Sequence, residues 1–155
     1  MEVELAEILS TLCQYPPFNE MEEESMLEQM VTEMEIRYVR GSSTVIQPGE
    51  NNGHLYFIRS GAMEVFSRSG DLLRRMGEGE LFGYASLLRS GKVTQEIRAL
   101  EDSLLYLIPS VWFKRLYEEN DTFSDFFELT REVRLRTAMQ SQAAANSDVS
   151  LMTCP

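Results

Sequence analysis

Residues 77–108 read GEGELFGYASLLRSGKVTQEIRALEDSLLYLI, and this stretch decides the fold. It opens with a glycine-rich turn, and Gly83 then leads into the apolar segment Ala85–Leu88, which we interpret as a single helical turn. A helix that starts at a glycine exposes unpaired backbone N–H groups, and without a Cβ at Gly83 a phosphate can approach them closely. We therefore predict that residues 79–95, called the cradle below, bind an anionic ligand.

The chain around the cradle has an apolar period of two, and glycine, asparagine and serine turns interrupt it at intervals of about ten residues. Eight short strands that curve around a common interior predict a mainly β fold, a jelly-roll-like β-roll with flanking helices. The predicted strands are Ile36–Arg40, Thr44–Gln47, Leu55–Ser60, Ala62–Arg68, Leu72–Met76, Glu80–Phe82, Thr94–Leu100 and Ser103–Ile108. The side chains expected to point into the interior include Val45, Leu55, Phe57, Val65, Leu81 and Ile97.

Helical periodicity precedes and follows the strands. The segment Val3–Cys13 carries one apolar face and ends before two consecutive prolines, which cannot continue the helical hydrogen bonds. A second helix is predicted at Glu22–Glu33, with an acidic outer face that is typical of a solvated surface. After Pro109 the helical spacing of apolar residues returns at residues 112–117. A longer helix is predicted at Thr122–Met139.

The longer C-terminal helix is apolar around more of its circumference than packing against one barrel requires. We therefore predict that it pairs with the same helix of a second copy, which gives a two-fold homodimer. The residues expected to form this dimer helix interface are Phe123, Phe126, Phe127 and Val133.

These patterns divide the chain into four segments. The N-terminal helices occupy residues 1–35, the β-roll with its cradle 36–108, and the C-terminal helices 109–139. Residues 140–155 begin with the polar run QSQAAANSDVS, which is typical of a linker, and are expected to end in the start of a further domain.

Composition restricts the possible functions. A chain of 155 residues with 43% hydrophobic residues forms one domain of ordinary size. It has no apolar run of about 18 residues and no secretory signal, so we expect a cytoplasmic protein without a membrane partner. A net charge of −11 would repel a phosphate backbone, so nucleic acid is not an expected partner.

Residues suited to catalysis or metal binding are scarce. Cys13 and Cys154 lie at opposite ends of the chain, and His54 is the single histidine. No Ser–His–Asp, Cys–His or metal-ligand pattern is present. We predict that the chain is not an enzyme and binds no metal.

The order of two helices, an eight-stranded roll and closing helices resembles the cyclic-nucleotide-binding domain, which is found in the catabolite activator protein, kinase regulatory subunits and gated channels. Three segments carry the resemblance across about residues 15–139. They are YVRGSSTVIQPGE at 38–50, LYFIRSG at 55–61 and GELFG at 79–83. The resemblance implies a regulatory or sensor module of a signal transduction protein, without catalysis of its own.

The cradle departs from this resemblance at two anchor positions. Family members that bind cyclic AMP or cyclic GMP have a glutamate for the ribose 2′-hydroxyl where this chain has Tyr84. They have an arginine for the cyclic phosphate, followed by a small residue, where this chain has Val93 and Thr94. A charge-assisted contact contributes about 1.5–3 kcal/mol, so losing both would weaken binding by about two to four decades. The resemblance therefore implies a degenerate nucleotide pocket.

Lys92 would restore part of the positive charge that the missing arginine offers to a phosphate. It would act as a point charge, without the two parallel N–H donors of a guanidinium. The ligand would be a cyclic nucleotide or another small anionic molecule. The candidate ligand-binding residues are Phe82, Gly83, Tyr84, Ala85, Ser86, Lys92, Val93 and Thr94.

The cradle sequence FGYASLL at 82–88 is also similar to that of a bacterial subgroup. In this subgroup a cyclic-nucleotide-binding-like domain precedes CBS and nucleotidyltransferase-like domains. The end of the chain, SLMTCP at 150–155, looks like the opening of a CBS motif. We therefore expect an N-terminal piece of a longer regulatory protein, with those domains as partners. Two alternatives stay open: a ligand-free dimerisation scaffold, and the effector domain of a transcription regulator, which would need a helix-turn-helix after the long helix.

Overall fold

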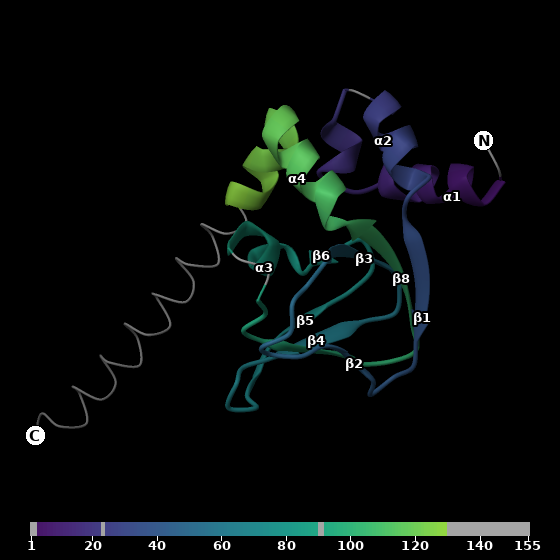
Figure 1. Cartoon of the computed structure of the whole chain (residues 1–155). Coiled ribbons are helices and arrows are strands. Elements are labelled where there is room, and N and C mark those ends of the chain that lie inside the picture. Colours follow the sequence, from purple (N-terminus) through teal and green to yellow (C-terminus); the bar gives the residue numbers. More distant parts are fainter. Residues whose placement is uncertain (1–2, 23, 90–91, 130–155) are drawn as a thin grey trace, which may run out of the picture.

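The computed structural model describes residues 3–22, 24–89 and 92–129, and it shows a β-roll with helices packed along one side (Figure 1). The elements in chain order are α1 (Val3–Leu12), η1 (Phe18–Glu20), α2 (Glu24–Val31), β1 (Glu35–Val39), β2 (Thr44–Ile46), β3 (His54–Ser60), β4 (Met63–Phe66), β5 (Leu72–Met76), β6 (Leu81–Phe82), α3 (Tyr84–Arg89), β7 (Glu96–Ala99), β8 (Ser103–Pro109) and α4 (Ser110–Glu119). Residues 121–129 are helical as well.

Every predicted strand is present, and the predicted fold class is confirmed. The largest differences are at strand ends. β4 is shorter than the predicted Ala62–Arg68, because residues 67–71 form a turn held by hydrogen bonds between Ser67 and Asp71. β7 begins at Glu96 and not at Thr94, and just before it the backbone of Val93 is hydrogen-bonded to Gly49 and Glu50 in another loop.

The strands form two four-stranded antiparallel sheets. The first has the order β1-β8-β3-β6, and the second has the order β2-β7-β4-β5. In the first sheet Leu55 pairs with Ile108 and Phe57 with Tyr106. Because side chains alternate between the faces of a sheet, these two pairs lie on one face and the residues between them on the other.

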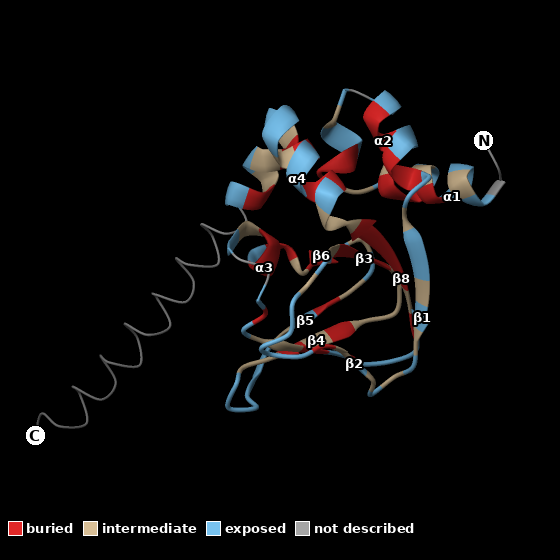
Figure 2. Ribbon diagram, viewed as in Figure 1, coloured by how far each residue is buried: buried red, intermediate tan, exposed pale blue. Residues whose placement is uncertain are grey.

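The middle strands of the first sheet, β3 and β8, are buried on both faces, which corrects part of the predicted interior. Val65 and Ile97 lie between the two sheets as predicted, and Val45 packs against that cluster. Leu55, Phe57 and Leu81 instead face the helices. Residues 55–58 are all buried, so the alternation that would distinguish the two faces is missing from the sequence of β3. Figure 2 shows this burial along β3 and on the sides of the helices that face it.

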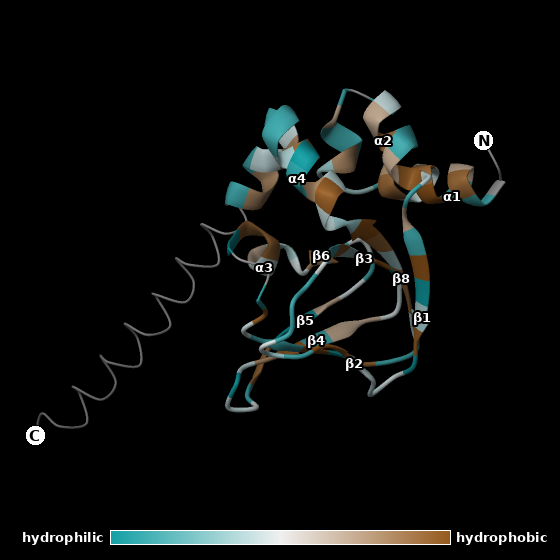
Figure 3. Ribbon diagram, in the orientation of Figure 1, coloured by the Kyte–Doolittle hydropathy of each residue, from teal (hydrophilic) through white to brown (hydrophobic). Residues whose placement is uncertain are grey.

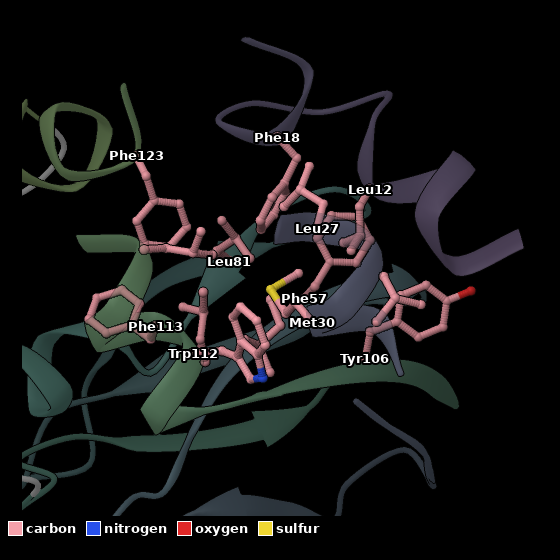
Figure 4. Packing of buried hydrophobic residues seen from close by; sticks show 14 of the residues in the cluster. Leu12, Phe18, Leu27, Met30, Phe57, Leu81, Tyr106, Trp112, Phe113 and Phe123 are labelled. Atoms are coloured by element: carbon pink, nitrogen blue, oxygen red, sulfur yellow. The ribbon is translucent and has the colours of Figure 1, made fainter. Parts of the chain in front are cut away.

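We call the cluster between the first sheet and the helices the helix-facing core. Its fully buried aromatic members include Phe18, Phe113, Phe123 and Phe127. Figure 4 shows Phe113 and Phe123 together, with ring centroids 5.6 Å apart. Burying one phenylalanine side chain contributes about 1.5–3 kcal/mol, so this cluster is a main source of stability for the helical layer.

Two of the four residues predicted for a dimer interface are buried within the chain itself. The ring of Phe123 lies 6.1 Å from that of Phe18 in η1, and the ring of Phe127 lies 5.0 Å from that of Tyr84 in α3. Phe126 is partly buried, and Val133 lies outside the described residues. The prediction assumed one barrel face as the only neighbour, but helix 121–129 packs against α3, α4 and η1 together.

The outer surface of the helical layer is polar. In Figure 3 the hydrophobic part of α4 lies where the helix leaves β8, and hydrophilic turns follow it. Trp112 in α4 donates its indole N–H to Glu33, which joins α4 to the end of α2. Within the described ranges, no helix combines the length and the apolar character that crossing a membrane requires.

Removing a ring from the helix-facing core should destabilise the fold. We expect Phe113→Ala to lower the free energy of unfolding by about 3–5 kcal/mol, because a fully buried ring leaves a cavity. Val111→Ala in the same helix is the control: its side chain is 66% exposed, and the change should stay within about 0.5 kcal/mol. Urea-induced unfolding measures both, and equal losses would contradict the described packing.

Candidate ligand site

A small cavity lies between the cradle and the inner face of the second sheet. Its volume is about 50 Å³. The lining residues come from β2, β5, α3, β7 and the segment before β7, and they are Ile46, Arg74, Gly83, Tyr84, Ala85, Ser86, Arg89, Val93, Thr94, Gln95 and Ile97.

The turn before α3 is held by an asparagine from the neighbouring loop. Asn52 donates from Nδ2 to the carbonyl oxygens of Gly83 at 2.9 Å and His54 at 2.8 Å. Ser86 donates from Oγ to the same Gly83 oxygen at 3.0 Å. The start of α3 is thus fastened to the beginning of β3, and the Ser86 hydroxyl is already used in that connection.

Gly83 is required by the protein's own packing. Its φ is +89°, and a Cβ there would come within 2.9 Å of Asn52 Nδ2 and 3.1 Å of the His54 carbonyl oxygen. The sequence predicts that the missing Cβ leaves room for a phosphate, but these protein atoms occupy that space. The reason for a glycine at this position is therefore the left-handed backbone and the close approach of the loop.

Six of the predicted ligand-binding residues line the cavity. They are Gly83, Tyr84, Ala85, Ser86, Val93 and Thr94. Tyr84 is only 3% exposed and belongs to the helix-facing core, where its ring packs against Phe127. Val93 is buried in the cluster between the two sheets.

Two predicted residues, Phe82 and Lys92, are not among the lining residues. Phe82 stacks on Tyr56 between the sheets, with ring centroids 4.8 Å apart. Lys92 is exposed and forms an isolated bridge with Asn51. Because extended residues alternate in direction, the burial of Val93 leaves the preceding side chain on the outside.

The sequence reasoning missed two arginines that line the cavity, Arg74 and Arg89. Arg89 closes α3 and donates from Nε to the Ala85 oxygen at 3.2 Å and from Nη2 to Thr94 Oγ1 at 3.4 Å. Arg74 lies in β5, where two leucines and two arginines in succession hide which side chains face inward. Arg74 pairs with the buried Val65, which shows that its side chain faces inward. The sequence alone does not give this pairing.

The charged side chains among the described residues that line the cavity are basic. Among the described residues that line it, Arg74 and Arg89 carry charge and none is an aspartate or glutamate. Burial lowers the pKa of His54, which lies near the cradle, so this imidazole is neutral near pH 7. The part of the chain that the structure describes contains no group of three or more His, Cys, Asp or Glu side chains placed to hold a metal ion.

Comparison with known families matches most of the described chain to one family model. The model of the cyclic nucleotide-binding domain matches residues 36–120, which extend from β1 through α4 and include the whole cradle.

Solved structures share the fold. The sensor domain of the transcriptional regulator DNR from Pseudomonas aeruginosa superposes with a TM-score of 0.76 at 14% identity, over 90% of this chain and 95% of that one. The catabolite activator protein of Thermus thermophilus superposes with a TM-score of 0.69 at 22% identity, over 81% of this chain and 61% of that one. The regulatory domain of Toxoplasma gondii PKA, crystallised with cAMP, superposes with a TM-score of 0.64 at 19% identity, over 74% of this chain and 45% of that one.

Sequence relatives are longer proteins. An uncharacterised Mycobacterium tuberculosis protein is 35% identical over 68 residues, which is 44% of this chain and 13% of the relative. An uncharacterised NTE family protein of the same organism is 23% identical over 108 residues, or 70% of this chain and 17% of the relative. The chain therefore spans less than a fifth of the length of either relative.

Substituting Gly83 should test its role in the fold. We expect Gly83→Ala to destabilise the protein by about 1–3 kcal/mol, because alanine is strained at this φ and its methyl group meets Asn52. Gly53→Ala in the adjoining loop is the control, since nothing lies within 4 Å of the added Cβ and its φ is not positive. Thermal unfolding compares the two variants. A Gly83→Ala protein as stable as the control would show that the turn adapts without cost.

Proposed function

Because the chain belongs to the cyclic nucleotide-binding domain family, we propose that it is a regulatory ligand-binding module of a longer signal transduction protein, without catalysis of its own and with a degenerate nucleotide pocket. One observation carries the proposal: the cavity at the cradle has a volume of only about 50 Å³ and has Tyr84 and Val93 at the two anchor positions.

The size of the cavity argues against a nucleotide in the described conformation. Pockets for small molecules usually measure about 300–1,000 Å³, whereas this cavity has room for only a few water molecules. A whole nucleotide could be enclosed only if α3 moved away from its neighbours. The free energy of that movement would be subtracted from the binding free energy, so the apparent affinity would fall.

The contact between the cradle and the closing helix supports a regulatory role. Tyr84, the first residue of α3, packs against Phe127, and Phe127 packs against Phe113 in α4 at 5.2 Å. A ligand that shifted α3 would therefore change the packing of helix 121–129. Such a ligand regulates a neighbouring domain if it binds the two arrangements with different affinity.

The rest of the protein is part of the proposal. The sequence relatives are several times longer than this chain, and one of them is a member of the NTE family. For this chain we propose the partners implied by the cradle sequence at 82–88. These partners are CBS and nucleotidyltransferase-like domains that follow the described domain in the same protein. The module would act by changing how such a domain is positioned or how its active site opens.

A second candidate function is a ligand-free dimerisation scaffold. Leu129 is 62% exposed at the end of the described helix, one turn after the partly buried Phe126. Residues three apart lie on the same side of a helix, so these two form a short apolar strip. The dimer would then use Leu129 and the residues after it, in place of the buried Phe123 and Phe127.

We expect cyclic AMP to bind this chain weakly or not at all. Tyr84 offers no carboxylate to the ribose hydroxyl, Val93 offers no charge, and the cavity is too small. Isothermal titration calorimetry with cyclic AMP measures the affinity, and AMP serves as the matched control. Submicromolar affinity for cyclic AMP but not for AMP would contradict the degenerate pocket.

We expect the chain to form a homodimer that depends on Leu129. Leu129→Glu should shift the mass measured by light scattering at micromolar concentration from dimer to monomer, because it places charge in an apolar strip. Val111→Glu is the control, since this residue is equally exposed on a different helix. A monomeric wild-type chain would remove the dimer from the proposal.

A further inference from the structure

The first step concerns the direction of Arg74. In the second sheet Arg74 pairs with Val65, Val65 pairs with Ile97, and Ile97 pairs with Ile46. Paired residues share a face, and Val65 is fully buried between the two sheets, so Arg74 lies at an inward position of β5. Its Nε atom is buried.

The neighbours of Arg74 show that this arrangement is not a simple consequence of hydrophobic patterning. Leu73 is 48% exposed, although a leucine would suit the interior better than an arginine. Arg75 lies on the outer face, where its Nε donates to Glu64 at 3.1 Å. β5 thus places a leucine outside and an arginine inside, and a local exception of this kind is typical of a functional site.

The second guanidinium comes from α3. Arg89, at the end of α3, is held by its bonds to Ala85 and Thr94. A guanidinium has five N–H donors, and these two bonds use two of them. Arg89 is therefore oriented by the cradle and still has donors for a ligand.

The charge of the site is opposite to that of the chain. The sequence has 25 acidic and 14 basic residues, yet the described residues that line this cavity include two arginines and no carboxylate. Two guanidiniums around one small space favour an oxyanion, because its oxygens accept hydrogen bonds from both. The neutral side chains of Thr94 and Gln95 add polar groups to the same wall.

We propose that Arg74 and Arg89 together bind the phosphate or carboxylate group of a small metabolite. This inference rests on the proposed function, because it takes the same cavity as the ligand site. The volume of about 50 Å³ suits a single anionic group, free or at the end of a larger molecule that extends outward. The charge comes from β5 and from the end of α3, and not from position 93 or from Lys92.

The test is a calorimetric titration of the whole chain with inorganic phosphate and, separately, with acetate, at constant ionic strength set by chloride. Phosphate or acetate should bind, and the stronger of the two identifies the anion class. We expect Arg74→Gln and Arg89→Gln each to weaken binding by about tenfold to a hundredfold, since each removes a charge-assisted contact. Arg75→Gln, the outward neighbour on β5, should bind as the wild type does.

Two further measurements distinguish a lost binding contact from a misfolded variant. Circular dichroism must show that the variants keep the β-roll, and Arg74→Lys, which keeps the charge without the fork, should bind with an intermediate affinity. Binding that is absent for both anions would overturn the proposal. So would binding that Arg74→Gln and Arg75→Gln weaken equally.

Failure of this inference can be separated from failure of the proposed function. Trp112, the single tryptophan of the chain, is buried in the helix-facing core, and its fluorescence reports changes there. If neither anion binds but a nucleotide binds and changes the fluorescence, the arginine site is wrong and the regulatory module stands. If phosphate binds through both arginines with no change in fluorescence or oligomeric state, the arginine site stands and the regulatory module is contradicted.

Discussion

The contact between Tyr84 and Phe127 is the interaction on which the arrangement of the site depends. It joins the first residue of α3 to the closing helix, with ring centroids 5.0 Å apart. On the other side, Asn52 fixes the turn at Gly83 to the start of β3. The cradle is therefore held between the roll and the helical layer, and any movement of α3 must change both contacts.

The same contact explains how a residue that departs from the family pattern is used. A carboxylate after the Phe-Gly pair would need a polar partner, whereas the tyrosine ring gains by burial and by packing against aromatic neighbours. Tyr84 thus contributes to the helix-facing core, at the position where the family resemblance implies a glutamate that contacts the ligand. The aromatic contact of Tyr84 therefore stabilises the packing of α3 against helix 121–129.

The charges of the molecule are divided between surface and cavity. The outward face of the second sheet carries ordinary ion pairs, such as Arg75 with Glu64 at 3.1 Å and Arg98 with Glu96 at 2.7 Å, and exposed pairs of this kind contribute little stability. Arg74 belongs to the inward face of that sheet, where it lines the cavity. β5 thus turns Arg74 inward and the next residue, Arg75, outward, so an inward basic position occurs in a chain whose overall composition is acidic.

The sequence by itself determined the elements and their order, because period-two apolar segments, glycine turns and helical periodicity are local properties. It also determined which segment forms the cradle, since the GELFG turn at 79–83 and the short apolar helix after it are contiguous. It did not determine which face of β3 meets the helices, because Leu55–Ile58 are all apolar and both faces are buried. The tertiary structure alone decided that Phe123 and Phe127 belong to the chain's own core and that Arg74 and Arg89 line one cavity. Phe123 meets Phe18 and Phe127 meets Tyr84, contacts between residues from separate parts of the sequence, and only the pairing of strands and the packing of helices bring such residues together.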